Sequence, residues 1–244
     1  DPFGLAALNN LTAVYDGDRV DWRLSVDYRF SPEILLYGTV GTGFKGGGVT
    51  ARPFLPTHAT QGTFGPETVT AYELGLKTDL FDRRLRVNLA GFYNDYKAIQ
   101  LPLSDCSAYG GGPCAVIANA GDGKMWGFEA ELSATPVDNL MIDASLSLIG
   151  SEYESISPAV GGTITAGSPI VSPETQWSAG IQYEIDMVDA GSITPRFDVA
   201  YRGRQYAGTV LNTVDPDFEY FPSYVLGNAR LTWRNVDRDL SISF

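Results

Sequence analysis

Residue types that carry out covalent chemistry are scarce in this sequence, and they do not combine into a recognisable active site. The chain has a single histidine, His58, in the segment Pro56-Thr57-His58-Ala59. Hydrolysis of the Ser-His-Asp kind would need that one imidazole as its base, and one imidazole cannot build a zinc site alone. We therefore expect no catalytic residues, no metal site and no cofactor, and we interpret His58 first as a solvated loop residue.

Four carboxylates in the central part of the chain raise the question of acid/base pairs. They are Glu129, Glu131, Asp143 and Glu184. Glycosidase chemistry needs two carboxyl groups that face each other across the bond to be cleaved. Because these four are distributed over several expected strands, we interpret them as charges that line a water-filled lumen.

The segment Gly41-Thr42-Gly43-Phe44-Lys45-Gly46 formally matches the dinucleotide fingerprint G-x-G-x-x-G, and it follows an expected strand. A pyrophosphate would need the N-terminus of a helix directly after the motif. Gly47, Gly48 and Pro53 come next, and they disfavour a helix. We expect a strand end that opens into a loop, and no nucleotide site.

The two cysteines, Cys106 and Cys114, flank a short stretch rich in Gly and Pro. No second cysteine pair or histidine cluster accompanies them, so we expect a disulfide that closes a small loop in an oxidising compartment. On the loop-entropy model such a bond stabilises the fold by about 2 to 3 kcal/mol. Two unpaired thiols are the alternative.

Aromatic and cationic side chains gather at or just beyond the ends of expected strands, on the side where the connections are long. The chemistry that such side chains offer is non-covalent ligand binding. An aromatic girdle at a membrane interface is the simpler explanation for tyrosines on the apolar register. The candidate ligand-binding residues are Phe44, Lys45, Arg52, His58, Tyr109, Arg204 and Tyr206.

The composition limits the elements that position these side chains. The 244 residues carry a formal charge of −12, with 29 acidic against 17 basic residues, which disfavours nucleic acid as a partner. The 27 glycines, 13 tyrosines and 12 phenylalanines favour strands and turns over helices. No apolar run reaches the roughly 18 residues of a spanning helix, so in a membrane this chain would have to cross with strands.

Apolar and polar residues alternate with a period of two in ten segments. In the first segment Leu24 and Val26 alternate with Arg23 and Ser25, which is the pattern of a strand with one apolar and one polar face. Glu and Arg on the polar faces are rarely buried unpaired, so we expect these faces to line a wet lumen. The expected strands cover about residues 20–30, 34–43, 72–80, 85–94, 126–134, 140–148, 177–185, 193–201, 225–233 and 240–244.

The connections between these segments alternate in length. Short turns are expected near Pro32, Asp82, Val137, Asp189 and Val236, and long polar connections at about residues 44–66, 99–118, 154–173 and 207–222. Short periplasmic turns on one rim and long extracellular loops on the other are typical of outer-membrane barrels. The predicted fold is all-β: an antiparallel up-and-down transmembrane β-barrel in contact with outer-membrane lipid.

Several stretches resemble the C-terminal part of the β-barrel of a TonB-dependent outer-membrane receptor. Each stretch is weak by itself, whereas their order and spacing over about residues 20–244 are specific for that family. They are Tyr28–Tyr37 running into Gly43–Gly48, Pro66–Lys77, Leu89–Lys97 with Gln100, Gly127–Leu132 and Ser172–Ser178.

This resemblance implies a 22-stranded barrel closed by an N-terminal plug domain, which takes up a scarce nutrient with energy from TonB. The default ligand is a small-molecule ferric siderophore, and the location is the bacterial outer membrane. The sequence provides about ten strands, with no plug domain, no TonB box and no closing strands. We therefore expect residues 1–244 to be a β-barrel fragment of a larger receptor.

Three other functions share part of the pattern. A passive outer-membrane porin would have similar strands without a plug, and usually one loop folded inward. A small outer-membrane enzyme barrel needs only ten strands, but the lone His58 disfavours it. A soluble carbohydrate-binding β domain would stay out of detergent. This chain is expected to partition into detergent, because four tryptophans are predicted to point outward: Trp22, Trp126, Trp177 and Trp233.

Overall fold

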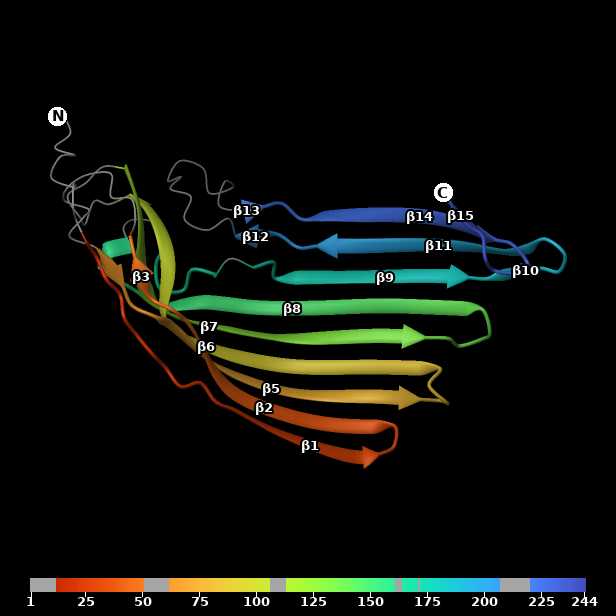
Figure 1. Cartoon of the computed structure of the whole chain (residues 1–244), viewed down its shortest axis with the longest axis horizontal. Coiled ribbons are helices and arrows are strands. Elements are labelled where there is room, and N and C mark those ends of the chain that lie inside the picture. The colour runs from red at the N-terminus through yellow and green to blue at the C-terminus, as the bar shows by residue number, and fades with distance from the viewer. Residues whose placement is uncertain (1–11, 51–61, 106–112, 161–163, 171, 207–219) are drawn as a thin grey trace.

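The structure is a computed structural model that describes residues 12–50, 62–105, 113–160, 164–170, 172–206 and 220–244 (Figure 1). Its main element is one antiparallel sheet in which strands follow each other in sequence order. The strands of this sheet are β1 (Arg23–Ser31), β2 (Ile34–Lys45), β5 (Glu67–Leu80), β6 (Leu85–Asp105), β7 (Pro113–Ala134), β8 (Leu140–Ile156), β9 (Thr175–Tyr183), β10 (Ile185–Met187), β11 (Gly191–Arg202), β14 (Tyr224–Arg234) and β15 (Ser241–Ser243).

The long connections contain two small sheets and one short helical turn. These elements are β3 (Gly48–Val49) paired with β4 (Thr63–Phe64), β12 (Gln205–Tyr206) paired with β13 (Tyr220–Phe221), and the 3-10 turn η4 (Pro158–Val160). No helix in the described ranges is long and apolar enough to cross a membrane.

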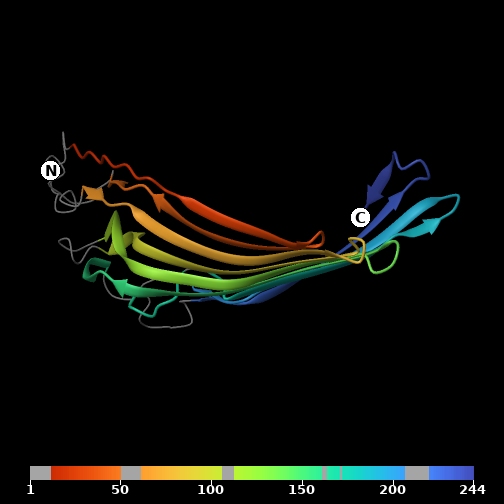
Figure 2. The same cartoon turned by 90° about the horizontal axis from the view of Figure 1, so that it is seen from below.

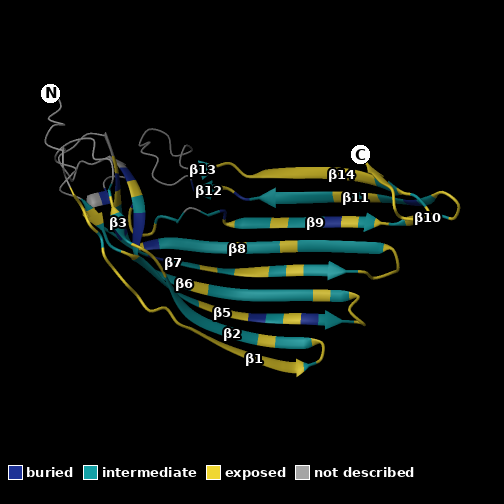
Figure 3. Cartoon of the chain, in the orientation of Figure 1, coloured by how far each residue is buried: buried dark blue, intermediate teal, exposed yellow. Residues whose placement is uncertain are grey.

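All ten predicted strands are present, so the prediction of an all-β, antiparallel up-and-down sheet is confirmed. The sheet is curved like a trough, with its short turns at one end and its long connections at the other (Figure 2). β1 and β15 lie at its two edges, and within the described residues they do not pair with each other. β1 and β14 are accordingly exposed along most of their length (Figure 3).

The strand register divides the side chains into two faces, because directly opposed residues of neighbouring strands point to the same side. The outer face is apolar, and on it Tyr72, Tyr93 and Trp126 are directly opposed across β5, β6 and β7. Further along the sheet, the rings of Trp177 and Tyr201 stack with their centroids 5.8 Å apart. Exposed apolar side chains with aromatic rows toward one end are what lipid contact requires.

The five short turns are confirmed, and a backbone or side-chain bond joins each of them to its neighbours. In the turn between β5 and β6, Phe81, Asp82 and Arg83 all have positive φ, which costs about 1–2 kcal/mol per residue. The bonds that join the turns are Asp79 N–H to the Glu33 carbonyl (2.8 Å), Arg84 to Asp138 (2.8 Å), Asn139 to Asp186 (3.2 Å), Arg238 to Glu184 (3.0 Å) and Trp233 Nε1 to the Ala190 carbonyl (2.9 Å).

One predicted loop is wrong for most of its length. Residues 99–118 were expected to be a long polar connection, but β6 continues to Asp105 and β7 begins at Pro113. The reason is apolar burial: Leu103, Val116 and Ala120 form a small core above the rest of the sheet. The ends of β6 and β7 therefore stand as a hairpin that bends out of the plane of the sheet (Figure 1).

Candidate functional site

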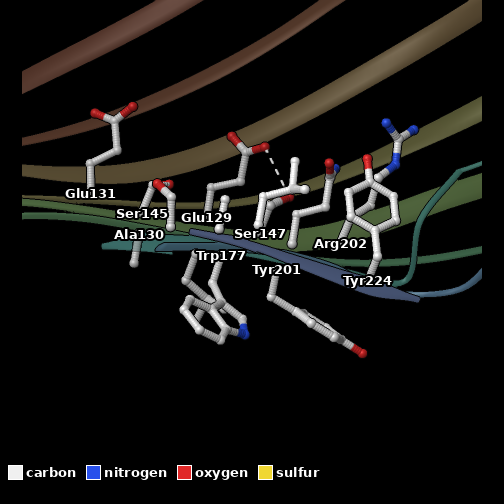
Figure 4. A pocket seen from close by; sticks show the side chains of 14 residues that line it. Glu129, Ala130, Glu131, Ser145, Ser147, Trp177, Tyr201, Arg202 and Tyr224 are labelled. Atoms are coloured by element: carbon white, nitrogen blue, oxygen red, sulfur yellow. Dashed lines mark hydrogen bonds between the residues drawn. The ribbon is translucent and has the colours of Figure 1, made fainter. Parts of the chain in front are cut away.

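The inner face of the trough carries the polar side chains that a solute or a lumen-filling domain would meet. Two neighbouring rows of directly opposed residues cross five strands, from β7 to β14. Figure 4 shows the carboxylates, serines and Arg202 of these rows on one side of the sheet, with Trp177 and Tyr201 on the other. The first row is Glu129, Ser147, Gln176, Arg202 and Tyr224. The second row, next to the first, is Glu131, Ser145, Ser178, Ala200 and Leu226.

Hydrogen bonds between neighbouring strands hold this polar surface in place. The hydroxyls of Ser145 and Ser178 lie 2.8 Å apart, and Ser147 donates to Glu129 over 3.5 Å. Asn88 of β6 donates to Glu131 over 3.2 Å. Neither glutamate forms an ion pair with another described residue, so the middle of the inner face keeps an uncompensated negative charge.

The arrangement supports hydrogen bonding and charge recognition, and it does not support bond cleavage. Glu129 and Glu131 are two residues apart on one strand, about 7 Å along its axis, and they point the same way. Two carboxyl groups side by side cannot flank a substrate bond from opposite sides. Within the described ranges, no group of three or more His, Cys, Asp or Glu side chains is arranged to hold a metal ion.

A charged cluster lies lower on the inner face, toward the short turns. The Arg196 guanidinium, 18% exposed, binds both carboxylate oxygens of Asp143 at 2.9 and 3.1 Å, and Nε donates to Asp198 over 3.0 Å. The guanidinium lies across Gly180, where an added Cβ would sit 2.4 Å from Nη2. In this arrangement the cluster leaves no room for a Cβ at this point of β9, so a larger residue there would displace the ends of the three charged side chains.

Glu184 is displaced from the position that the sequence predicted. It lies between β9 and β10 at the rim of short turns, where it pairs with Arg238 over 3.0 Å. Glu129, Glu131 and Asp143 lie on the inner face, in agreement with their interpretation as lumen-lining charges, whereas Glu184 lies at the rim. The interruption between two strands could not be read from a continuous alternating pattern.

The connection at 154–173 was predicted to be polar, but part of it is packed in an apolar cluster. Part of the connection expected at 154–173 folds back over the inner face at the long-loop end, and we call residues 164–170 the ledge. Tyr153 N–H donates to the Ser168 carbonyl, and Gly167 N–H donates to the Tyr153 carbonyl. Ile164 packs with Ile99 and Tyr153 in a buried cluster. Apolar side chains thus cover this part of the inner face.

The ledge changes the chemistry of Tyr153, which lies on the long-loop side of the aromatic row and so outside the membrane-spanning part. Its side chain is 3% exposed. Burial, followed by the nearby Tyr206 and Glu67, raises the pKa of Tyr153 to about 12 from its ordinary value of 10.0. The phenol is therefore held in its neutral form.

This shift predicts how the stability of the full-length protein depends on pH. Because the pKa of Tyr153 is higher in the folded than in the unfolded protein, the contribution of its neutral phenol to the free energy of unfolding is complete below pH 10. This contribution is lost as the pH rises toward about 12. We expect Tyr153→Phe to lose less stability than the wild type across that window, measured by denaturant unfolding at each pH. Identical pH dependence in the two proteins would contradict a buried, neutral Tyr153.

The structure brings only some of the predicted ligand-binding residues to the inner side. Lys45 shares the inner register with Glu67, whereas Phe44 is opposed to Thr68 on the outer face and is 45% exposed. A place on the outer face favours lipid contact for Phe44 over ligand contact. Arg52, His58, Tyr109 and Cys106 lie outside the described residues, as does the side chain of Cys114, so their roles and the disulfide stay predictions.

Arg204 and Tyr206 lie together beyond the end of β11. The Arg204 guanidinium lies 4.8 Å from the ring centroid of Tyr220, and its Nη2 is 3.4 Å from Glu174. Tyr206 is buried and meets Tyr220 edge to face, with the ring centroids 5.6 Å apart. Arg204 is the exposed member of this cluster, and the two tyrosines support it.

Sequence reasoning missed two amides at the same end of the sheet, one buried (Gln100) and one partly buried (Asn119). Gln100 and Asn119 bind backbone groups of the connection between β2 and β5. Gln100 was noticed only as part of a family motif, with no role. The alternation of Ile99, Leu101 and Leu103 around it was the available signal that a strand continues here.

Comparison with known proteins gives a family and a fold. The family model described as "TonB dependent receptor-like, beta-barrel" matches residues 4–244. The metal-pseudopaline receptor CntO of Pseudomonas aeruginosa is 27% identical over 130 residues, which are 53% of this chain and 16% of that protein.

Two solved structures show the same fold. The ferric yersiniabactin uptake receptor FyuA of Yersinia pestis has a TM-score of 0.67 and 22% identity, and the match covers 91% of this chain and 30% of that one. The ferric-catecholate import receptor Fiu of E. coli K12 has a TM-score of 0.66 and 18% identity, covering 91% and 29%. The chain thus spans less than a third of each of these three proteins.

Proposed function

Because the chain belongs to the family of TonB-dependent receptor-like β-barrels, we propose that it is part of a receptor that takes up a scarce nutrient, by default an iron-siderophore complex. The observation that carries the proposal is the family match over residues 4–244. This family is located in the bacterial outer membrane, and its members are transport receptors and not enzymes. The apolar outer face and polar inner face described above agree with that location.

The proposal includes a complete barrel. β1 at one edge, and β14 beyond its short pairing with β15 at the other, leave backbone N–H and C=O groups without partners in the described sheet, and such groups are costly in hydrocarbon. We expect further strands of the receptor to pair there and close a barrel of 22 strands. A plug domain in the lumen and TonB on the periplasmic side complete the proposed assembly.

The names of similar proteins support a metal complex as the ligand class. CntO is a metal-pseudopaline receptor, FyuA takes up ferric yersiniabactin, and Fiu imports ferric catecholates. We place ligand contact at the long-loop end, with Lys45 and Arg204 as the described cations that face it. Arg52, His58 and Tyr109 stay candidates on the sequence pattern alone.

Uptake by the full-length receptor tests this function. Cells that lack the receptor are supplied with ferric yersiniabactin, ferric citrate or metal-pseudopaline, with and without the wild-type gene. We expect receptor-dependent uptake of one of these probes, abolished by a protonophore, because TonB supplies the energy. Uptake that continues at full rate with the protonophore would indicate the passive porin.

The same assay tests Arg204. We expect Arg204→Ala to weaken ligand affinity about tenfold, which is the loss of roughly one hydrogen bond to a charged group. Arg84→Ala, at the opposite rim, serves as the matched control and should leave the affinity unchanged. Equal affinity of wild type and Arg204→Ala would remove Arg204 from the ligand site.

A further inference from the structure

Gln100 binds the chain where the β2–β5 ladder ends. The last pair of that ladder is Lys45 with Glu67, so the carbonyls of Gly46 and Gly65 lie just beyond it and have no partner in the ladder. The Gln100 side chain reaches across from β6, and its Nε2 donates to the carbonyls of Gly46 (2.9 Å), Gly65 (3.0 Å) and Lys45 (3.4 Å). One primary amide thus binds both ends of the connection between β2 and β5.

The position of Gln100 is itself fixed by a bulge in β6. Ala98 has a φ of 55°, in the left-handed region, where the register of the β6–β7 ladder shifts. Its N–H donates to Asp122 Oδ1 (3.0 Å), and its carbonyl accepts from Asn119 Nδ2 (2.9 Å). The Gln100 N–H donates to Glu67 Oε2 (2.8 Å). The side chains of Asp122 and Asn119 thus bind the N–H and the carbonyl of Ala98, the residue with the strained backbone.

Asn119 of β7 binds the connection at the same place. Its Oδ1 accepts from the Gly65 N–H over 2.7 Å, and its Nδ2 donates to the Gly65 carbonyl over 3.0 Å. We call residues 46–50 and 62–66 the stem, which includes the short β3–β4 ladder. Gln100 and Asn119 together fix the base of the stem against the β6–β7 hairpin.

We propose that Gln100 and Asn119 are positioning residues of the ligand entrance: they fix the stem, and with it the end of β2 from which Lys45 faces the inner side. Gln100 is 6% exposed, so it acts through the backbone that it binds and not by touching ligand. Burying an amide is unfavourable unless its hydrogen bonds are made, and Ile99 and Leu101 show that apolar side chains fit this region. The amide therefore specifies one arrangement of the stem. The inference depends on the proposed uptake function.

The test uses the full-length receptor with Gln100→Met, which keeps the size of the side chain and removes the donor. Asn88→Leu is the matched control, because Asn88 is an amide on the same strand that binds Glu131 and does not reach the stem. Hydrogen exchange of the stem, measured without ligand, should be at least about tenfold faster in Gln100→Met only. Trypsin cleavage after Lys45 should accelerate in parallel.

Ligand binding then separates positioning from a structural role. With ferric yersiniabactin, ferric citrate or metal-pseudopaline as probe, Gln100→Met should raise the Kd about tenfold and leave the maximal uptake rate unchanged. Asn119→Asp keeps the bond from the Gly65 N–H but places a carboxylate oxygen against the carbonyls of Gly65 and Ala98, which accepted from Nδ2, so a rise in Kd is expected here too. It also serves as the second variant if Gln100→Met does not fold.

The possible outcomes are distinct. Faster exchange with an unchanged Kd would overturn the positioning role and leave the uptake function intact. Unchanged exchange would show that Gln100 does not hold the stem, and the inference would be wrong. If the wild type takes up none of the three probes, the proposed function fails for them and the role of Gln100 in ligand binding fails with it, whatever the exchange rates show.

Discussion

Leu76→Arg is expected to destabilise the full-length receptor in phospholipid vesicles by about 2 to 4 kcal/mol, the cost of an arginine near the middle of the bilayer. Leu76 lies on the outer face, midway along β5 between Tyr72 in the aromatic row and Leu80 at the short turn. Its directly opposed neighbours are Leu36 and Leu89. A guanidinium at this position has only lipid chains and apolar side chains around it.

The control is Asn88→Arg, which places an arginine on the inner face. Asn88 directly precedes Leu89, the β6 residue that is opposed to Leu76. Asn88 of β6 is opposed to Lys77 and Glu131 on the inner face, so Asn88→Arg meets a carboxylate and water. We expect its effect to stay within about 0.5 kcal/mol. Guanidinium-induced unfolding in vesicles measures both variants. Equal losses would mean that the two faces have been assigned incorrectly.

Arg196→Met is expected to cost about 1.5 to 3 kcal/mol, because it removes hydrogen bonds between charged groups in a mostly shielded cluster. The variant leaves Asp143 of β8 and Asp198 of β11, the strands on either side of β9, without the cation that joins them. Replacing both aspartates by asparagine in the same variant should recover part of the loss, since the uncompensated charge is then gone.

Arg230→Met is the matched control for this cluster. Arg230 is directly opposed to Arg196 on the same face, and within the described residues it forms no ion pair. We expect it to unfold at nearly the wild-type denaturant concentration. Losses of similar size in the two single variants would show that positive charge on the inner wall, and not the geometry of the cluster, sets the stability.

Alternation was enough to predict the strands because lipid on one side and water on the other force a period of two on every strand. Leu24 against Ser25 in β1 and Leu146 against Ser147 in β8 both follow it. The short turns were equally readable, since a turn interrupts the alternation for only a few residues. Burial at the long-loop end was harder to predict, because it depends on which connections fold over which strands.

The misread segments share one physical cause. Gly and Pro around 109–113 suggested a solvated loop, yet Leu103 and Val116 pack under η4 and extend the strands. Ile164 and Ile170 belong to the connection at 154–173 that was expected to be polar, and they cover Tyr153. In each case an apolar residue found its partner in a distant connection, and a local pattern carries no information about such a partner.

The bonds between the short turns have a mechanical consequence. From Glu33 at one side to Arg238 at the other, each turn of the described sheet is bound to the next, so the bonds form a continuous chain along the rim. A load applied to one turn, such as a pull on material held in the lumen, is therefore shared among several hairpins. Splaying any one hairpin at this rim requires breaking bonds to its neighbours as well as its own ladder.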